Sequence, residues 1–221
     1  MPSALIVGAS RGIGLGLTAE LLGRGWDVVA THRSEAPALA ATGARLAQVD
    51  IDQDDSVSAL ASRLAGEIFD HVLINAGITG SRADTASTVS REAMAQLFWT
   101  NAIAPIRAGR ILLPLAKEGG SIGFMTSILG SVGGRTHGYA ELYSASKAAL
   151  NSLSRGFAVQ DIGSRAVTVL NLHPGWVKTD MGGPDADIDV ATSVRGLADV
   201  ITAARAPGQY YVDFKGKEIP W

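Results

Sequence analysis

The chain contains no cysteine and carries almost no net charge. Without cysteine it forms neither disulfides nor thiolate metal sites, and we expect no metal site. A formal net charge of −2 over 221 residues gives no electrostatic reason to expect nucleic acid or a membrane surface as a partner. The chain also lacks a basic leader and any run of the roughly 20 apolar residues that span a bilayer. We therefore expect a cytoplasmic protein in which residues 1–221 form a single domain.

Short apolar runs alternate along the chain with longer amphipathic segments. The runs have the length and composition of buried strands and cover residues 4–7, 27–31, 45–51, 70–77, 120–127, 166–175 and 209–214. Helices are expected between them, at residues 14–25, 55–66, 91–117, 143–161 and 190–204. This alternation predicts an α/β fold of the Rossmann type, a doubly wound parallel sheet with helices on both faces. In such folds ligands bind outside the carboxyl ends of the strands.

The turn between the first expected strand and the first helix reads GASRGIG, and its glycines are Gly8, Gly12 and Gly14. Glycines let the backbone approach a pyrophosphate, and the helix N-terminus adds free N–H groups and a partial positive charge. Tight packing alone is an alternative explanation of these glycines. The same letters also contain G-x-S-x-G, in which Ser10 would be an esterase nucleophile. Against the esterase, only seven residues precede the turn, and no acid is singled out as partner for His173.

The ends of the next strands indicate which nucleotide is bound. The second strand ends in ATHRS without the acidic residue that holds the ribose of NAD, whereas Arg33, helped by Arg11, could pair with a 2′-phosphate. The sequence therefore favours NADP(H), with a solvated surface role as the alternative for either arginine. Asp50 could accept a hydrogen bond from the adenine or cap the following turn. Gly77, in the sequence NAG, would let the backbone lie against a ribose.

A proline interrupts the long helix expected at 91–117. Pro105 has no N–H, so the carbonyl of Asn101 loses its partner four residues later. A bound water could take this acceptor and begin a proton path to solvent. The alternative is a kinked helix in which Asn101 only faces the core.

Tyr143 and Lys147 stand four residues apart in YSASK and share one face of a helix. We expect the ammonium, and an oxidised nicotinamide beside it, to lower the pKa of the phenol and make Tyr143 a general acid/base for a carbonyl. Ser127, at the end of the fifth strand, could stabilise charge on the substrate oxygen, and Ser131 is the alternative serine. A plain surface contact would also explain the Tyr–Lys pair.

Together with HPGWVKTD at residues 173–180, these motifs resemble the short-chain dehydrogenase/reductase family over the whole chain and in the expected order. HPGWVKTDMGG and the ending GKEIPW are similar to the branch with C-factor and sniffer-type carbonyl reductases. The resemblance implies a catalytic tetrad of Asn101, Ser127, Tyr143 and Lys147. It also implies cofactor contacts from Gly8, Ser10, Arg11, Gly12, Ile13, Gly14, Arg33, Asp50, Ile51, Asn75, Ala76, Gly77, Tyr143, Lys147, Pro174, Gly175, Val177 and Thr179.

The chain departs from the family pattern in two places. Val7 stands where the family often has threonine, so one hydrogen bond of the turn is expected to be absent, and Ser127 lies farther before Tyr143 than is typical. The segment that forms the substrate lid in the family is short here, 181–189, and predicts an open site with weak discrimination among carbonyl compounds.

The expected function is NADPH-dependent reduction of a small aldehyde or ketone. An NADP(H)-binding signalling protein with little turnover is the alternative. Relatives pack as homodimers or homotetramers on the helices expected at 91–117 and 143–161, and the same assembly is possible here.

Overall fold

The computed structural model describes residues 1–221 and contains one sheet of seven parallel strands in the order β3-β2-β1-β4-β5-β6-β7. The strands are β1 (Ser3–Val7), β2 (Asp27–His32), β3 (Arg45–Gln48), β4 (Phe69–Ile74), β5 (Ala116–Met125), β6 (Thr168–His173) and β7 (Gln209–Asp213). The order reverses beside β1, which makes the carboxyl ends of β1 and β4 the switch point where such sheets bind ligands. The predicted doubly wound fold is confirmed.

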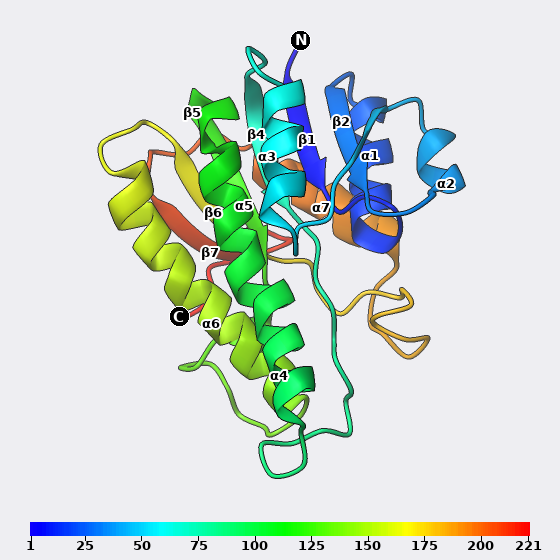
Figure 1. The fold of residues 1–221 in the computed structure, drawn as a ribbon, viewed down its shortest axis with the longest axis vertical. Coiled ribbons are helices and arrows are strands. Elements are labelled where there is room, and N and C mark those ends of the chain that lie inside the picture. Colours follow the sequence, from blue (N-terminus) through cyan, green and yellow to red (C-terminus); the bar gives the residue numbers. More distant parts are fainter.

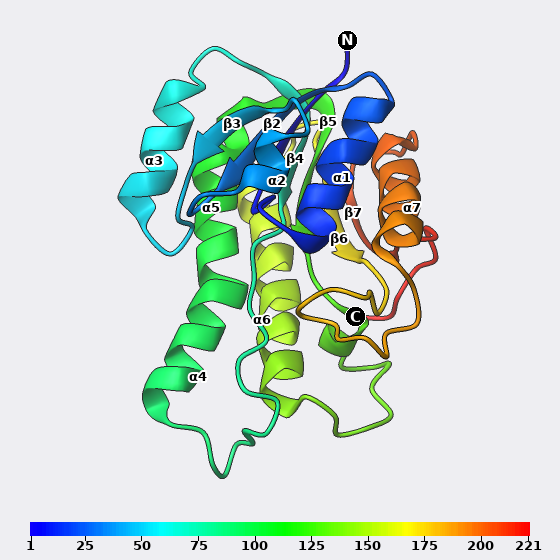
Figure 2. The same ribbon diagram turned by 90° about the vertical axis from the view of Figure 1, so that its right-hand side faces the viewer.

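Helices cover both faces of this sheet (Figure 2). They are α1 (Gly12–Gly23), α2 (Pro37–Ala40), α3 (Asp54–Arg63), α4 (Arg91–Phe98), α5 (Ala104–Leu112), α6 (Glu141–Phe157) and α7 (Val190–Thr202). One core joins the sheet to α3, α5 and α6, and the other joins its opposite face to α1 and α7. β1 alternates between the two, since Leu5 and Val7 enter the first core while Ala4 and Ile6 enter the second. Burial on both faces explains the uniformly apolar strands.

The helix expected at 91–117 is not continuous. A π-helical turn, Trp99–Ile103, separates α4 from α5, and a 3₁₀ turn, Leu113–Leu115, follows α5. The N–H of Ala104 bonds to the carbonyl of Trp99, five residues back, directly before Pro105. Because proline supplies no N–H, the regular ladder cannot continue through it, and the helix widens instead.

Other boundaries also differ from those expected. β5 begins at Ala116 rather than at 120, because Ala116 already pairs with Phe69 of β4, and the register shifts before Ser121 pairs with His71. The short α2 was not expected. Several other helices and strands are shorter at one or both ends than the sequence predicted. A π-helical turn, Ala158–Ile162, forms the last part of the helix expected at 143–161.

The segments between the strands and the helices that follow them gather at the carboxyl ends of the strands, in the lower half of Figure 1. They include residues 75–90 after β4, 126–140 after β5 and 174–189 after β6. None of the helices combines the length and the apolar composition needed to cross a bilayer.

Candidate active site

The turn between β1 and α1 is fixed from both neighbouring strands. Gly8 and Gly12 have φ angles of +92° and +55°, which L side chains rarely adopt. The N–H of Gly8 donates to Thr31 Oγ1 on β2 at 3.0 Å, and Asn75 Nδ2 after β4 donates to the Gly8 carbonyl at 2.6 Å. The threonine of β2 thus supplies a side-chain hydrogen bond to the turn that Val7 cannot make.

This turn has the features of a phosphate site. A Cβ on Gly14 would lie 2.2 Å from the Gly8 carbonyl oxygen, so only glycine lets the helix start this close to the strand. No side chain caps the first N–H groups of α1, and no acidic residue stands in its first turn. The partial positive charge of the helix N-terminus therefore remains available to an anion. The residues present fit a dinucleotide pyrophosphate, and Ser10 and Ile13 lie in the same turn.

The segment after β6 meets this turn. A Cβ on Gly12 would lie 3.4 Å from Thr179 Cγ2, and Arg11 forms an exposed ion pair of 3.4 Å with Asp180. Val177 is buried and pairs with Ile188 in an isolated bridge. The structure therefore brings together the two loops to which the sequence assigned cofactor contacts.

The end of this segment that leaves β6 is held tightly. Ser193 Oγ, on α7, donates to the Pro174 carbonyl at 2.6 Å. Gly175 has a φ of +88°, and a Cβ there would lie 2.6 Å from Ile188 Cδ1. The loop consequently leaves the sheet along a defined path.

The two arginines proposed for the 2′-phosphate, Arg11 and Arg33, differ in whether their guanidinium has a partner in the protein. Arg11 is paired with Asp180, whereas the guanidinium of exposed Arg33, after β2, makes no ion pair or hydrogen bond. Asp50 Oδ1 accepts from the N–H of Asp52 at 3.1 Å, so this side chain caps its own turn, and Ile51 beside it is buried. Arg33 is thus the cation without a protein partner.

The NAG segment connects the turn to the remaining site residues. The N–H groups of Asn75 and Ala76 both donate to the Val7 carbonyl, at 2.9 and 3.1 Å. A Cβ on Gly77 would lie 3.1 Å from Asn101 Oδ1 and 3.3 Å from Lys147 Nζ. Gly77 therefore marks the place where the nucleotide turn and the tetrad residues adjoin.

Asn101 is completely buried in the π-helical turn and ties three segments together. Its amide exchanges two hydrogen bonds with the backbone of Ile78, receiving from the N–H at 2.8 Å and donating to the carbonyl at 2.7 Å. It also donates to Ser146 Oγ at 3.0 Å, and Ser146 lies on α6 between Tyr143 and Lys147. The side chain of Asn101 therefore holds the loop after β4 against the helix that carries the Tyr–Lys pair.

Lys147 is buried, and its Nζ lies 5.7 Å from the centroid of the Tyr143 ring. Nζ donates to the carbonyl of Met125 at 3.0 Å. Burial lowers the pKa of this ammonium to about 8, because removal from water penalises the charged form. The lysine is held with its charge directed at the end of β5 and at Gly77.

The expected lowering of the Tyr143 pKa is wrong for the protein alone. Burial raises the pKa of the phenol to about 12, and hydrogen bonding by Ser127 and the charge of Arg82 only partly offset this. Sequence spacing showed the nearby lysine but not the loss of water around the phenol, which is the larger effect. The phenol is therefore protonated at neutral pH.

The two candidate serines have different partners. Ser127 follows β5, and its Oγ accepts from the N–H of Leu129 at 3.2 Å, starting the 3₁₀ turn Ile128–Gly130. The Ser131 hydroxyl donates to the carbonyl of Pro220 and accepts from the N–H of Gly134 at 2.9 Å. Of the two, only Ser127 affects the pKa of the Tyr143 phenol, which it lowers.

Arg82 is a residue that the sequence analysis missed. It lies after β4, and its Nη2 donates to the carbonyl of Met181 in the short lid segment. It forms no ion pair, and its charge lowers the pKa of Tyr143. Nothing in the sequence near Arg82 indicates this, because Met181 and Tyr143 come from distant segments of the chain.

The structure gives no support to the serine hydrolase alternative. Ser10 and His173 share no hydrogen bond, and β4 and β5 separate the strands that end at them. Burial lowers the pKa of His173 to about 4, and its Nδ1 has no partner.

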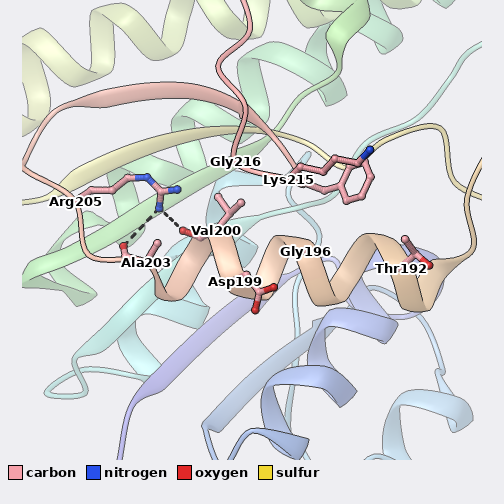
Figure 3. Close-up of a pocket in the computed structure, with 9 residues that line it drawn as sticks. Thr192, Gly196, Asp199, Val200, Ala203, Arg205, Lys215 and Gly216 are labelled. Carbon is pink, nitrogen blue, oxygen red and sulfur yellow. Dashed lines mark hydrogen bonds between the residues drawn. The ribbon is translucent and has the colours of Figure 1, made fainter.

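A surface hollow of about 330 Å³ lies along α7, away from all of these residues (Figure 3). Arg205 crosses it to donate to the carbonyls of Val200 and Ala203 at the end of that helix. This is helix capping, and none of the sequence-predicted site residues lines the hollow.

Three similarities to known proteins agree with this geometry. The chain is 38% identical to C-signal of Myxococcus xanthus over 167 residues, which cover 74% of this chain and 99% of that protein. A short-chain dehydrogenase/reductase from Burkholderia multivorans with bound NADP superimposes with a TM-score of 0.96 at 40% identity, covering 100% of this chain and 99% of that chain. A carbonyl reductase from Pseudomonas aeruginosa in complex with NADP gives a TM-score of 0.90 at 39% identity, with 100% of both chains covered. Residues 2–187 match the family of short chain dehydrogenases, so the resemblance read from the motifs is confirmed and the chain belongs to that family.

Proposed function

We propose that this protein reduces a small aldehyde or ketone with NADPH and that Tyr143 supplies the proton. The observation that carries the proposal is the junction at Gly77, where the nucleotide turn meets the side chains of Asn101 and Lys147. A cofactor site and an acid/base site then form one continuous surface at the carboxyl ends of the strands.

The cofactor would be held by the backbone of residues 8–14 and 75–77, by Val177 and Thr179, and by Arg33. When bound, reduced nicotinamide supplies a hydride to a carbonyl carbon. The unpaired guanidinium of Arg33 and the absence of an acid at the end of β2 support the phosphorylated nucleotide. The NADP in the Burkholderia and Pseudomonas structures supports the same choice.

The proton chemistry follows from the protonation state of the Tyr143 phenol. With a pKa of about 12, Tyr143 is protonated at neutral pH and can donate to the oxygen of a carbonyl. Ser127 donates to the same oxygen and stabilises its developing charge. Lys147 directs its ammonium at the sugar side of the site, where Gly77 leaves space. In the oxidative direction the phenol must first lose its proton, so that direction requires high pH.

Replacement of Tyr143 by phenylalanine tests the proposal. We expect NADPH-dependent reduction across an aldehyde and ketone panel to fall at least about a hundredfold, while the Kd for NADPH stays within twofold. Tyr210→Phe is the matched control and should retain most activity, because its hydroxyl bonds only to the Ala206 carbonyl. Full activity of the Tyr143→Phe variant would contradict the assignment, and absence of NADPH binding to the wild type would contradict the function.

The similarity to C-signal favours a second candidate function, NADP(H) binding that serves signalling with little turnover. The same variant separates the two functions. An enzyme loses its cellular effect with Tyr143→Phe, whereas a nucleotide-binding signal keeps it.

We further propose a homodimer or homotetramer. The helical stretches 91–112 and 141–162, which include α4, α5, α6 and their π-helical turns, expose apolar side chains, namely Met94, Trp99, Ile103, Leu153 and Val159. Exposed apolar side chains of this kind are typical of surfaces that another chain covers. Light scattering should give a mass of two or four chains, and Leu153→Glu should lower it.

A further inference from the structure

The chain turns back after β7 and lies over the loop that carries Ser127. Val212 pairs with Glu218 in an antiparallel bridge, and the N–H of Ile219 donates to the Tyr211 carbonyl at 2.8 Å. This return places residues 219–221, here called the strap, beside the serine loop of residues 127–134.

The strap and the serine loop are joined by two hydrogen bonds. Ser131 Oγ donates to the carbonyl of Pro220, and the N–H of Gly133 donates to the carbonyl of Trp221 at 3.0 Å. The centroid of the Trp221 ring lies 5.2 Å from that of the Tyr211 ring. The guanidinium of Arg155, on α6, also lies over the Trp221 ring, 5.7 Å from its centroid. The far half of the serine loop is thereby fixed to β7.

Tyr211 fixes the near half. Its ring is only 2% exposed, and its hydroxyl donates to the main-chain carbonyl of Ser127 at 2.5 Å. Burial raises the pKa of this phenol to about 12, so the hydroxyl keeps its proton and remains a donor at neutral pH. The Ser127 carbonyl also accepts from the N–H of Gly130 at 2.8 Å, so it keeps a partner if the Tyr211 hydroxyl is removed.

We propose that Tyr211, with the strap behind it, is a positioning residue that aims the Ser127 hydroxyl at the Tyr143 phenol and the substrate oxygen. The proposal rests on the reductase function above. Two hydrogen bonds to one carbonyl define the orientation of the peptide that carries the serine, and Trp221 keeps the Tyr211 ring from turning away. A difference of a fraction of an ångström at such a group changes the rate of reaction more than the affinity for cofactor.

The test is Tyr211→Phe, measured alone and in a Ser127→Ala background. In the wild-type background we expect kcat to fall about three- to tenfold, the worth of one hydrogen bond, with the Kd for NADPH unchanged. In the Ser127→Ala background we expect no further loss, because the group being aimed is absent. Tyr210→Phe is the matched control, since its hydroxyl bonds only to the Ala206 carbonyl, and it should retain full activity.

Three outcomes would overturn the proposal. These are unchanged kcat in Tyr211→Phe, an equal loss in both backgrounds, or a loss that appears only as weaker NADPH binding. A wild type that reduces no carbonyl would instead overturn the reductase function, and this proposal with it. Trp221→Ala keeps the Tyr211 hydroxyl but removes the ring that packs against Tyr211. If the strap supports Tyr211, this variant should also lower kcat, by less than Tyr211→Phe does.

Discussion

The turn of residues 8–14 and the cluster formed by Asn101, Ser127, Tyr143 and Lys147 lie side by side but are built differently. The turn offers backbone N–H groups and open space, and its only charged side chain, Arg11, points to solvent. The cluster offers largely buried side chains, of which Asn101 and Lys147 bond to the backbone of other segments and Asn101 also bonds to Ser146. In the proposed function, nucleotide binding would therefore depend on the absence of side chains in the turn, whereas proton transfer would depend on polar groups that are costly to bury.

The cost is visible in Lys147. Its pKa is about 8 in the fold and 10.5 for the free side chain, so the folded chain holds the proton less tightly than the unfolded chain. Well below pH 8 both states are protonated, and burial of the charge destabilises the fold by up to about 3 kcal/mol. This penalty disappears as pH rises from 8 to 10.5, where the folded state has already released its proton.

The largest expected effect comes from Lys147→Met. We expect reductase activity to fall about a hundredfold or more, because the buried cation next to the tyrosine and the sugar site is lost. We also expect the melting temperature without nucleotide to rise by several degrees at pH 7, and this gain to shrink toward pH 10. Calorimetry across that range checks the sign. A melting temperature that falls at pH 7 would mean that the buried ammonium stabilises the fold.

The second effect concerns the turn. Gly14→Ala would place a Cβ 2.2 Å from the Gly8 carbonyl oxygen, so the strand and helix must separate. We expect kcat/KM for NADPH to fall about a hundredfold or somewhat less. Gly23→Ala at the other end of the same helix is the control. Apart from the backbone of its own helix and its chain neighbours, nothing lies within 4 Å of a Cβ at this position, so Gly23→Ala should keep activity and stabilise the fold slightly. If the two variants had equal kcat/KM for NADPH, the absence of a side chain at Gly14 would not be what the turn needs for binding.

The third effect separates the two exposed arginines. Arg33→Gln should reduce the preference for NADPH over NADH about tenfold, because its guanidinium is the one without a partner. Arg11→Gln should change the preference less, since Arg11 is already engaged with Asp180. Titration of both nucleotides against the three proteins measures this. An unchanged preference in Arg33→Gln would show that the 2′-phosphate is bound elsewhere.

The smallest effect comes from Arg82→Gln. Removing this positive charge raises the pKa of Tyr143 further, so less phenolate is present at any pH below that pKa. We expect alcohol oxidation at pH 9–10 to fall about two- to threefold, and reduction at pH 7 to be unaffected because the phenol is protonated in either case. Arg82→Lys should restore the oxidation rate. A slower reduction at pH 7 would show that Arg82 acts on the substrate instead.

Features encoded by neighbours in the chain could be predicted from the sequence. The strand–helix alternation gave the parallel sheet, because buried strands must be apolar on both faces. Pro105 predicted a break in the long helix, since the missing N–H is a local property. The glycines of the turn are likewise near neighbours in the chain, and two of them, Gly8 and Gly12, adopt the positive φ angles that a sharp turn requires.

Features that depend on distant residues could not be predicted in this way. The hydroxyl of Tyr211 finds its acceptor 84 residues earlier in the chain, and Arg82 meets Met181 across 99 residues. The sign of the Tyr143 pKa shift depends on how much water the fold removes from the phenol, which spacing does not reveal. β5 was expected too late because its first half is polar, and its pairing comes from β4.

The widened turn at Trp99–Ile103 gives this stretch a strict dependence on length. An α-helix rotates by about 100° per residue, and a π-helical turn accommodates one residue more than the regular spiral. Removing any single amino acid here would let this helical stretch straighten and would swing the carboxamide of Asn101 away from Ile78 and Ser146. A related sequence that lacks one residue at this point is therefore expected to lack the hydrogen bonds of this asparagine to the loop after β4 and to α6, even if it keeps the equivalents of Asn101, Ser127, Tyr143 and Lys147.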